Sequence, residues 1–138
     1  MKTKKPKAAT YEQVHDNHAM VQRVEEGLPV MDVVKFGKQA GFTNDELAQV
    51  INIPARTYAR RIAEKGRFKV HEGERAARLM RVFDYAKRLF VTDENTRGWF
   101  NAKLIVLGGK TPLEYAQTEP GAREVEAVIE RIEDGVVQ

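Results

Sequence analysis

Residues 47–62, LAQVINIPARTYARRI, decide the fold of this chain, because they have the spacing of two short helices joined by a tight turn. Ala48 is small enough for the two helices to approach each other closely. Asn52 stands at the turn, where a left-handed backbone is needed and where asparagine tolerates it. The apolar residues expected to face inward are Ile53, Tyr58 and Ile62. The stretch therefore predicts a helix-turn-helix.

The second helix of this motif is rich in donors on its outer face. Arginine can bridge O6 and N7 of guanine, and threonine can contact a phosphate or a thymine methyl group. The candidate DNA-contacting residues are Ala55, Arg56, Thr57, Arg60 and Arg61. An ordinary helical hairpin with a basic surface is the alternative interpretation. Turn, inward apolar positions and clustered arginines coincide here, which favours DNA binding.

Basic charge is concentrated around the motif, although the formal net charge of the chain is only +3. Residues 54–69 carry six lysines and arginines against one glutamate, and residues 1–7 carry four lysines and no acid. Residues 119–134 carry six acids against two arginines. Such runs can simply cover solvated helix faces. The asymmetry also predicts a polyanion-facing middle and a C-terminus with a different partner.

Helix start and stop signals continue on the N-terminal side of the motif, whereas hairpin signals are missing, so the predicted fold class is all-α. Thr10 with Gln13 forms a capping box, which begins a helix of roughly four turns that Gly27 ends. A second helix is expected between Pro29 and Gly41. The first helix of the motif has its own capping box, Thr43 with Glu46, and a hydrophobic staple, Phe42 with Leu47.

Longer helices are expected after residue 70. Two stripes of apolar residues with helical spacing predict one helix that ends near Phe90 and a final helix that ends at Gly135. The stripes are Leu79, Val82, Phe83, Ala86 and Phe90, then Val125, Val128, Ile129 and Ile132. Between them, Thr92 is expected to start a helix that continues to the break at residues 107–109. Thr111, with Pro112 and Glu114, is expected to start a short one.

Composition restricts the class of protein. A chain of 138 residues with 42% hydrophobic and 31% charged residues fits one compact domain or two very small ones. The sequence has no run of ~18 apolar residues that a membrane span requires, and no signal-peptide core. It contains no cysteine, which excludes disulfides and thiolate zinc sites. A cytoplasmic location is expected.

Enzyme signatures are weak. Residues 107–111, LGGKT, end like a phosphate-binding loop, but Leu104 stands where that motif needs glycine, and Pro112 removes an amide donor. His15 and His18 could share a metal ion, but a third ligand is not evident. A serine nucleophile is impossible, because the chain contains no serine. We therefore predict no catalytic residue, no metal site and no cofactor.

Two segments resemble known families. The helix-turn-helix segment resembles the Xre class of bacterial repressors, and the C-terminal segment resembles the toxin-binding domain of the Xre, ParS and MbcA antitoxins. The second resemblance rests on Trp99 and on residues 107–114, 118–122 and 131–136. Together the two resemblances cover most of the chain from about residue 28 onward. The chain departs from the family at Lys103, where proline is frequent, and at Asp134, where histidine is frequent.

The resemblance implies an antitoxin of a type II toxin–antitoxin system, whose partner is a RES-domain toxin that degrades NAD. It implies that the C-terminal domain blocks the NAD site of the toxin and that the N-terminal domain represses the operon. The implied organisation is a basic flexible tail at 1–9, a helix-turn-helix domain at 10–69 and a toxin-binding and dimerisation domain at 70–138. A homodimer is expected, because one helix-turn-helix reads too few base pairs to be selective. The alternative is a stand-alone DNA-binding regulator whose C-terminal helices only dimerise.

The expected toxin contacts are the glycine-rich segment and the end of the last helix with the tail after it. They comprise Leu107, Gly108, Gly109, Pro112, Leu113, Arg131, Glu133, Asp134, Gly135, Val136 and Val137. Arg131, Glu133 and Asp134 are expected to remain free of intrachain partners. A site that holds the pyrophosphate of NAD should be electropositive, so the two acids would complement it, and the two valines would fill an apolar part of the cleft.

Overall fold

The computed structural model describes residues 17–135, so the Thr10–Gln13 capping box, His15, Val136 and Val137 lie outside the described residues. Within them the regular elements are helices, which confirms the all-α prediction, and strand-like pairing is limited to two isolated bridges. The helices are α2 (Asn17–Glu25), α3 (Val30–Ala40), α4 (Asn44–Ile51), α5 (Ala55–Glu64), α6 (Val70–Phe90), α7 (Asp93–Phe100), the 3-10 helix η1 (Ile105–Leu107), α8 (Pro112–Tyr115) and α9 (Glu119–Glu133).

Threonines begin four of these helices. In each case the side-chain oxygen accepts a hydrogen bond of 3.0–3.1 Å from the backbone N–H three residues later, an interaction that contributes about 1 kcal/mol. These caps are Thr43 for α4, Thr92 for α7, Thr111 for α8 and Thr118 for α9. The first three confirm the starts predicted from sequence. The turn of the helix-turn-helix is also confirmed, since Asn52 has a left-handed backbone with φ 65° and ψ 48°.

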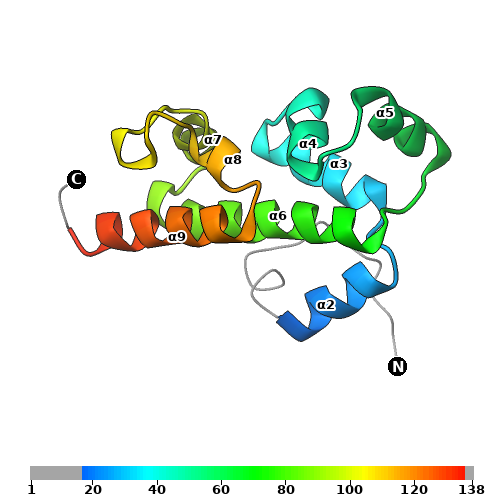
Figure 1. Cartoon of the computed structure of the whole chain (residues 1–138), viewed down its shortest axis with the longest axis horizontal. Coiled ribbons are helices and arrows are strands. Elements are labelled where there is room, and N and C mark those ends of the chain that lie inside the picture. Colours follow the sequence, from blue (N-terminus) through cyan, green and yellow to red (C-terminus); the bar gives the residue numbers. More distant parts are fainter. Residues whose placement is uncertain (1–16, 136–138) are drawn as a thin grey trace.

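Helix α6 is the long central element, with 21 residues, and it contacts both halves of the molecule. Figure 1 shows α3, α4 and α5 above one end of α6, and α7 and α8 above the other end. Helix α9 packs along α6, and α2 covers its side opposite α3–α5. The helix-turn-helix and the C-terminal helices therefore both pack against α6.

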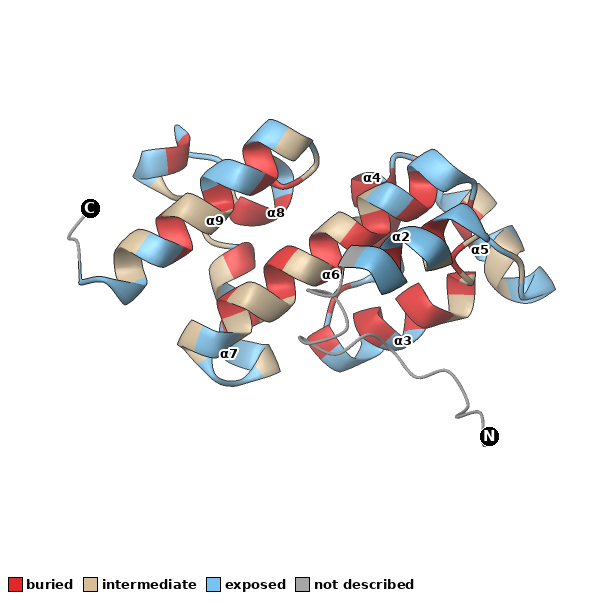
Figure 2. Cartoon of the chain, turned by 90° about the horizontal axis from the view of Figure 1, so that it is seen from below, coloured by how far each residue is buried: buried red, intermediate tan, exposed pale blue. Residues whose placement is uncertain are grey.

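Four phenylalanines join the two halves. The ring of Phe83 on α6 lies 5.4 Å from that of Phe36 on α3, 5.5 Å from that of Phe42 and 5.4 Å from that of Phe100 on α7. Several of these pairs have the edge-to-face arrangement that aromatic rings prefer. Figure 2 shows that buried residues follow α6 along its length. One hydrophobic core thus extends from α3 to α9.

The helix that begins after Thr92 is shorter than predicted. It ends at Phe100, and the expected continuation to residues 107–109 is wrong. The chain instead turns and forms a small closed loop, in which the N–H of Leu104 donates to the carbonyl of Lys110 at 3.1 Å. Leu107, only 2% exposed, anchors this loop in the core. Burial of Leu107 in the core and the pairing across the loop are not features of a regular helix, so local helical spacing does not reveal them.

Candidate DNA and protein interfaces

The outer face of α5 carries most of the predicted DNA-contacting residues. Ala55, Arg56 and Arg60 are exposed, and Thr57 is half-buried. Tyr58 on the opposite face is 1% exposed, and its ring stacks on Phe68 with centroids 6.3 Å apart. Burial raises the pKa of the Tyr58 hydroxyl to about 12, so this residue remains a neutral anchor beneath the helix.

Arg61 has a different position from its predicted one. Its guanidinium donates to both oxygens of the Glu72 carboxylate on α6, with Nη2 and Oε2 3.2 Å apart. The two side chains are 14% and 5% exposed. Arg61 follows Tyr58 by three residues, so both lie on the inward face of the helix. Arg61 therefore links α5 to α6 through Glu72, instead of standing on the exposed face where it was predicted.

The positive charge of Arg61 compensates for the burial of the Glu72 carboxylate. Burial alone would raise the pKa of Glu72, but the hydrogen bonds from Arg61 and from the N–H of Lys69 hold that pKa below its usual value. Glu72 therefore stays ionised beside its buried partner. The pair fixes the angle at which α5 presents Arg56 and Arg60 to solvent.

The predicted toxin-contacting segment divides into a buried part and an exposed part. Leu107, Pro112 and Leu113 are buried, so they support the surface from below and are unavailable as contacts, contrary to expectation. Gly108 and Gly109 are exposed and both have positive φ, 68° and 83°. The turn that closes the loop requires this conformation, which glycine adopts without strain.

Two apolar side chains that the sequence analysis did not select stand on this loop. Ile105 is 97% exposed and Val106 is 39% exposed. A local signal was present, because an isoleucine and a valine directly precede the buried leucine and the double glycine. The segment was expected to be helical, and on a helix their exposure could not be distinguished from burial.

An apolar groove lies beside Ile105. It has a volume of about 580 Å³ and separates the end of α7 from α9. Trp99 lines it from α7, Leu104 and Ile105 from the loop, and Val128 and Ile132 from α9. Lys103 is the charged residue among its lining. We call this feature the Trp99 groove.

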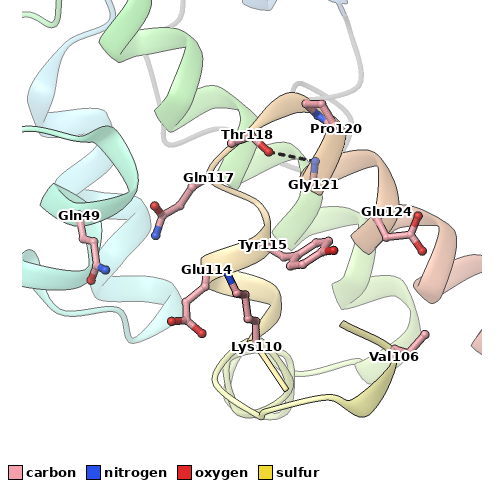
Figure 3. A pocket seen from close by; sticks show the side chains of 10 residues that line it. All are labelled: Gln49, Val106, Lys110, Glu114, Tyr115, Gln117, Thr118, Pro120, Gly121 and Glu124. Carbon is pink, nitrogen blue, oxygen red and sulfur yellow. Dashed lines mark hydrogen bonds between the residues drawn. The ribbon is translucent and has the colours of Figure 1, made fainter. Parts of the chain in front are cut away.

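A second, more polar depression lies between the helix-turn-helix and the C-terminal helices. Its volume is about 620 Å³, and Figure 3 shows Gln49 of α4 across from Lys110, Glu114 and Gln117. Hydrogen bonds from Thr111 lower the pKa of Glu114. Val106 lines both this depression and the Trp99 groove, so it stands on the ridge between them.

Side chains at the end of α9 form intrachain pairs that were not expected. Glu133 accepts a hydrogen bond of 3.1 Å from Arg88 on α6, and Arg131 donates to Glu124 at 3.3 Å. The expectation that Arg131 and Glu133 lack intrachain partners is therefore wrong, because α9 packs along α6 and one helical face brings Arg131 near Glu124. Asp134 and Gly135 are exposed.

Within residues 17–135, no group of three or more His, Asp or Glu side chains is placed so that it could hold a metal ion. In the same part of the chain, none of the helices combines the length and the apolar character needed to cross a membrane.

Comparison with known proteins assigns both halves of the chain. Residues 19–81 match the antitoxin Xre-like helix-turn-helix domain, and residues 86–135 match the antitoxin Xre/MbcA/ParS C-terminal toxin-binding domain. Antitoxin Xre of Photorhabdus laumondii is 37% identical over 115 residues, which cover 83% of this chain and 78% of the relative. Antitoxin Xre of Yersinia enterocolitica is 34% identical over 118 residues, covering 85% and 80%. Neither matched domain belongs to an enzyme family. The chain therefore belongs to the Xre antitoxin family and is the antitoxin of a toxin–antitoxin pair, with one domain for DNA and one for its toxin.

Proposed function

We propose that this antitoxin binds a RES-domain toxin that degrades NAD, occludes its NAD site and represses the shared operon. The observation that carries the proposal is the match of residues 86–135 to a toxin-binding domain in a chain that also holds a helix-turn-helix. In this proposal the protein acts in the cytoplasm, where both NAD and the operator are present.

Repression is assigned to α4 and α5. Arg56 and Arg60 are exposed on α5 and are available to base edges or phosphates. Thr57 is half-buried and is suited to a contact near the helix axis. One such helix spans only a few base pairs, so we propose that a homodimer binds two half-sites one helical turn apart. The lysines of the basic tail at 1–9 would add a salt-sensitive attraction to phosphates.

Occlusion is assigned to the end of α9 and the residues that follow it. Asp134 is exposed at the C-terminal end of the helix, and the chain continues for four more residues. The exposed carboxylate of Asp134 suits an electropositive site that holds a pyrophosphate. Glu133 stays with Arg88 and fixes the point from which the segment departs.

The proposal predicts a RES-domain toxin gene beside the gene of this protein, and co-expression of the two genes tests it. Growth should be rescued, and cellular NAD should stay at the level found without toxin. Deletion of residues 134–138 keeps the Arg88–Glu133 pair, so the fold should be retained while the toxin regains NAD consumption. Unchanged toxicity with the full chain would refute the antitoxin–RES pairing.

A further inference from the structure

We propose that the Trp99 groove, together with Ile105, is the surface that anchors the toxin, separately from the segment that occludes its NAD site. This inference rests on the proposed function. The toxin would insert a protruding apolar side chain between Trp99 and Ile132, and Ile105 would enter an apolar recess on the toxin. Because Lys103 lines the groove, a carboxylate on the toxin at its edge would complete the contact.

The loop that carries Ile105 is held in shape by its own hydrogen bonds. The N–H of Gly109 donates to the carbonyl of Leu104 at 2.9 Å, and the N–H of Gly108 donates to that of Ile105 at 2.9 Å. Leu104 is also paired with Lys110, and Leu107 is buried beneath the loop. Ile105 therefore points to solvent from an ordered frame. Binding through such a preorganised loop loses little conformational entropy.

The other wall of the groove is equally well supported. The Trp99 ring is half-buried, with its centroid 5.2 Å from that of Phe90 and 5.4 Å from that of Phe100. On α9, Val128 is 1% exposed at the base, and Ile132 is half-buried at the rim. Tryptophans in pockets with an apolar surround frequently dominate the binding energy of protein interfaces.

Single exposed apolar residues are ordinary on protein surfaces and need no partner. Here a 97% exposed isoleucine adjoins an apolar groove of about 580 Å³ with a tryptophan in its wall. A contiguous apolar surface of this kind, with a charged residue at its edge, is typical of a protein-binding site. Its apolar lining does not suit DNA, whose backbone is anionic.

Two observations favour the toxin as the occupant. The lining residues Trp99 to Ile132 all lie within residues 86–135, which match the toxin-binding domain. The groove also extends to Ile132, next to Glu133, where the proposed occluding segment departs from α9. Anchoring and occlusion are thus adjacent but use different residues.

The test separates anchoring from occlusion with purified full-length chains and the toxin encoded by the adjacent gene. Ile105→Asp places a charge at the anchor, and we expect it to weaken toxin binding by at least about 30-fold in calorimetry. Deletion of residues 134–138 should change the affinity by less than about threefold and yet restore NAD consumption at saturating antitoxin. The matched control is Val21→Asp on α2, which is 53% exposed and lies outside residues 86–135, and it should bind like the unaltered protein.

Each result of this binding test leads to a distinct conclusion. Because Ile105 is 97% exposed, its variant should unfold at the same temperature as the unaltered protein, so weakened binding cannot come from misfolding. Unchanged toxin affinity of Ile105→Asp would overturn the proposal. If Ile105→Asp dissociates a dimer in sedimentation but binds toxin normally, the groove is a self-association surface, and the proposal is again overturned. If the unaltered antitoxin does not bind this toxin, the proposed function itself fails.

Discussion

Arg60 and Arg61 are neighbours in sequence, but the structure gives them different environments. Arg60 is exposed on the outer face of α5, whereas Arg61 is paired with Glu72, whose side chain is 5% exposed. A residue three positions after the buried Tyr58 shares its face, so helical phase separates the two arginines. The arginine cluster of α5 therefore combines one residue that is paired within the protein, Arg61, with one that is exposed, Arg60.

Replacement of each arginine by alanine should distinguish these tasks. Arg61→Ala leaves Glu72 buried without its partner, so we expect the free energy of unfolding to fall by about 3 kcal/mol in urea denaturation. Arg60→Ala, the matched control, should change stability by less than about 0.5 kcal/mol and reduce operator affinity by about 1–3 kcal/mol. Equal stability of the two variants would contradict the assignment.

Asp84 on α6 has a strongly raised pKa. Burial raises its pKa to about 7, Lys87 opposes this and Asp93 adds to it, and Oδ2 of Asp84 has no hydrogen-bond partner within the described structure. In the unfolded chain the carboxyl titrates near ~3.9. Between these two values the folded state holds the proton more tightly. The ionisation of Asp84 therefore makes the protein less stable as pH rises from about 4 to about 7.

Asp84→Asn should remove this pH dependence. We expect the variant to be more stable than the unaltered protein at pH 8, by on the order of 1–2 kcal/mol, because partial solvent access reduces the full linkage effect. The difference should shrink towards pH 4. Chemical denaturation at several pH values measures it, with the exposed Asp45→Asn as control. A stability difference that is independent of pH would refute the pKa assignment.

At the scale of elements, α8 and α9 approach each other so closely that one position requires glycine. A Cβ on Gly121, in the first turn of α9, would stand 1.8 Å from the carbonyl oxygen of Tyr115 at the end of α8. Helix α9 also packs against α6, and its residues Val128 and Ile132 line the Trp99 groove. Gly98 in α7 is the opposite case, because a Cβ there meets no heavy atom within 4 Å.

Alanine substitution at these two glycines should have opposite effects. Gly121→Ala forces α9 away from α8, and we expect a loss of about 1–3 kcal/mol of stability, as for other overpacked sites. Gly98→Ala should be neutral or stabilise by up to about 1 kcal/mol, because alanine is the better helix former. Thermal unfolding followed by circular dichroism measures both. If Gly121→Ala leaves the stability unchanged, then α8 can shift away from α9 without loss of stability.

At the scale of the whole molecule, the two functional halves share α6. Residues of α6 before position 86, among them Leu79, Val82 and Phe83, belong to the same core as Phe100 and Ile129. The division expected at residues 69 and 70 remains a prediction. The family models end and begin at residues 81 and 86, within α6 itself.

The shared helix predicts how fragments behave. A fragment of residues 86–138 lacks most of α6, so we expect it to show no cooperative thermal transition in circular dichroism. A fragment of residues 70–138 retains α6 and should keep helical structure and toxin binding, while the full chain should unfold in one transition. A cooperative transition in the shorter fragment would mean that the C-terminal helices form a core without α6.

The sequence by itself determined the helical class, most helix boundaries and the helix-turn-helix. The capping boxes at Thr43 and Thr111 and the left-handed Asn52 depend on contacts within about four residues, so local spacing is sufficient to predict them. The family resemblance likewise rests on the order of short motifs along the chain.

Only the tertiary structure decided which side chains remain available to partners. Glu72 lies 11 residues from Arg61, and Arg88 lies 45 residues from Glu133, so no local pattern indicates either pair. The closure between Leu104 and Lys110 ends the expected helix early and leaves Ile105 in solvent. These contacts depend on how α5 packs on α3 and α4, and on how α7 and α9 pack against α6. Helices can therefore be predicted from residues that are close in sequence. Which residues form a binding surface depends on contacts between residues that are distant in sequence.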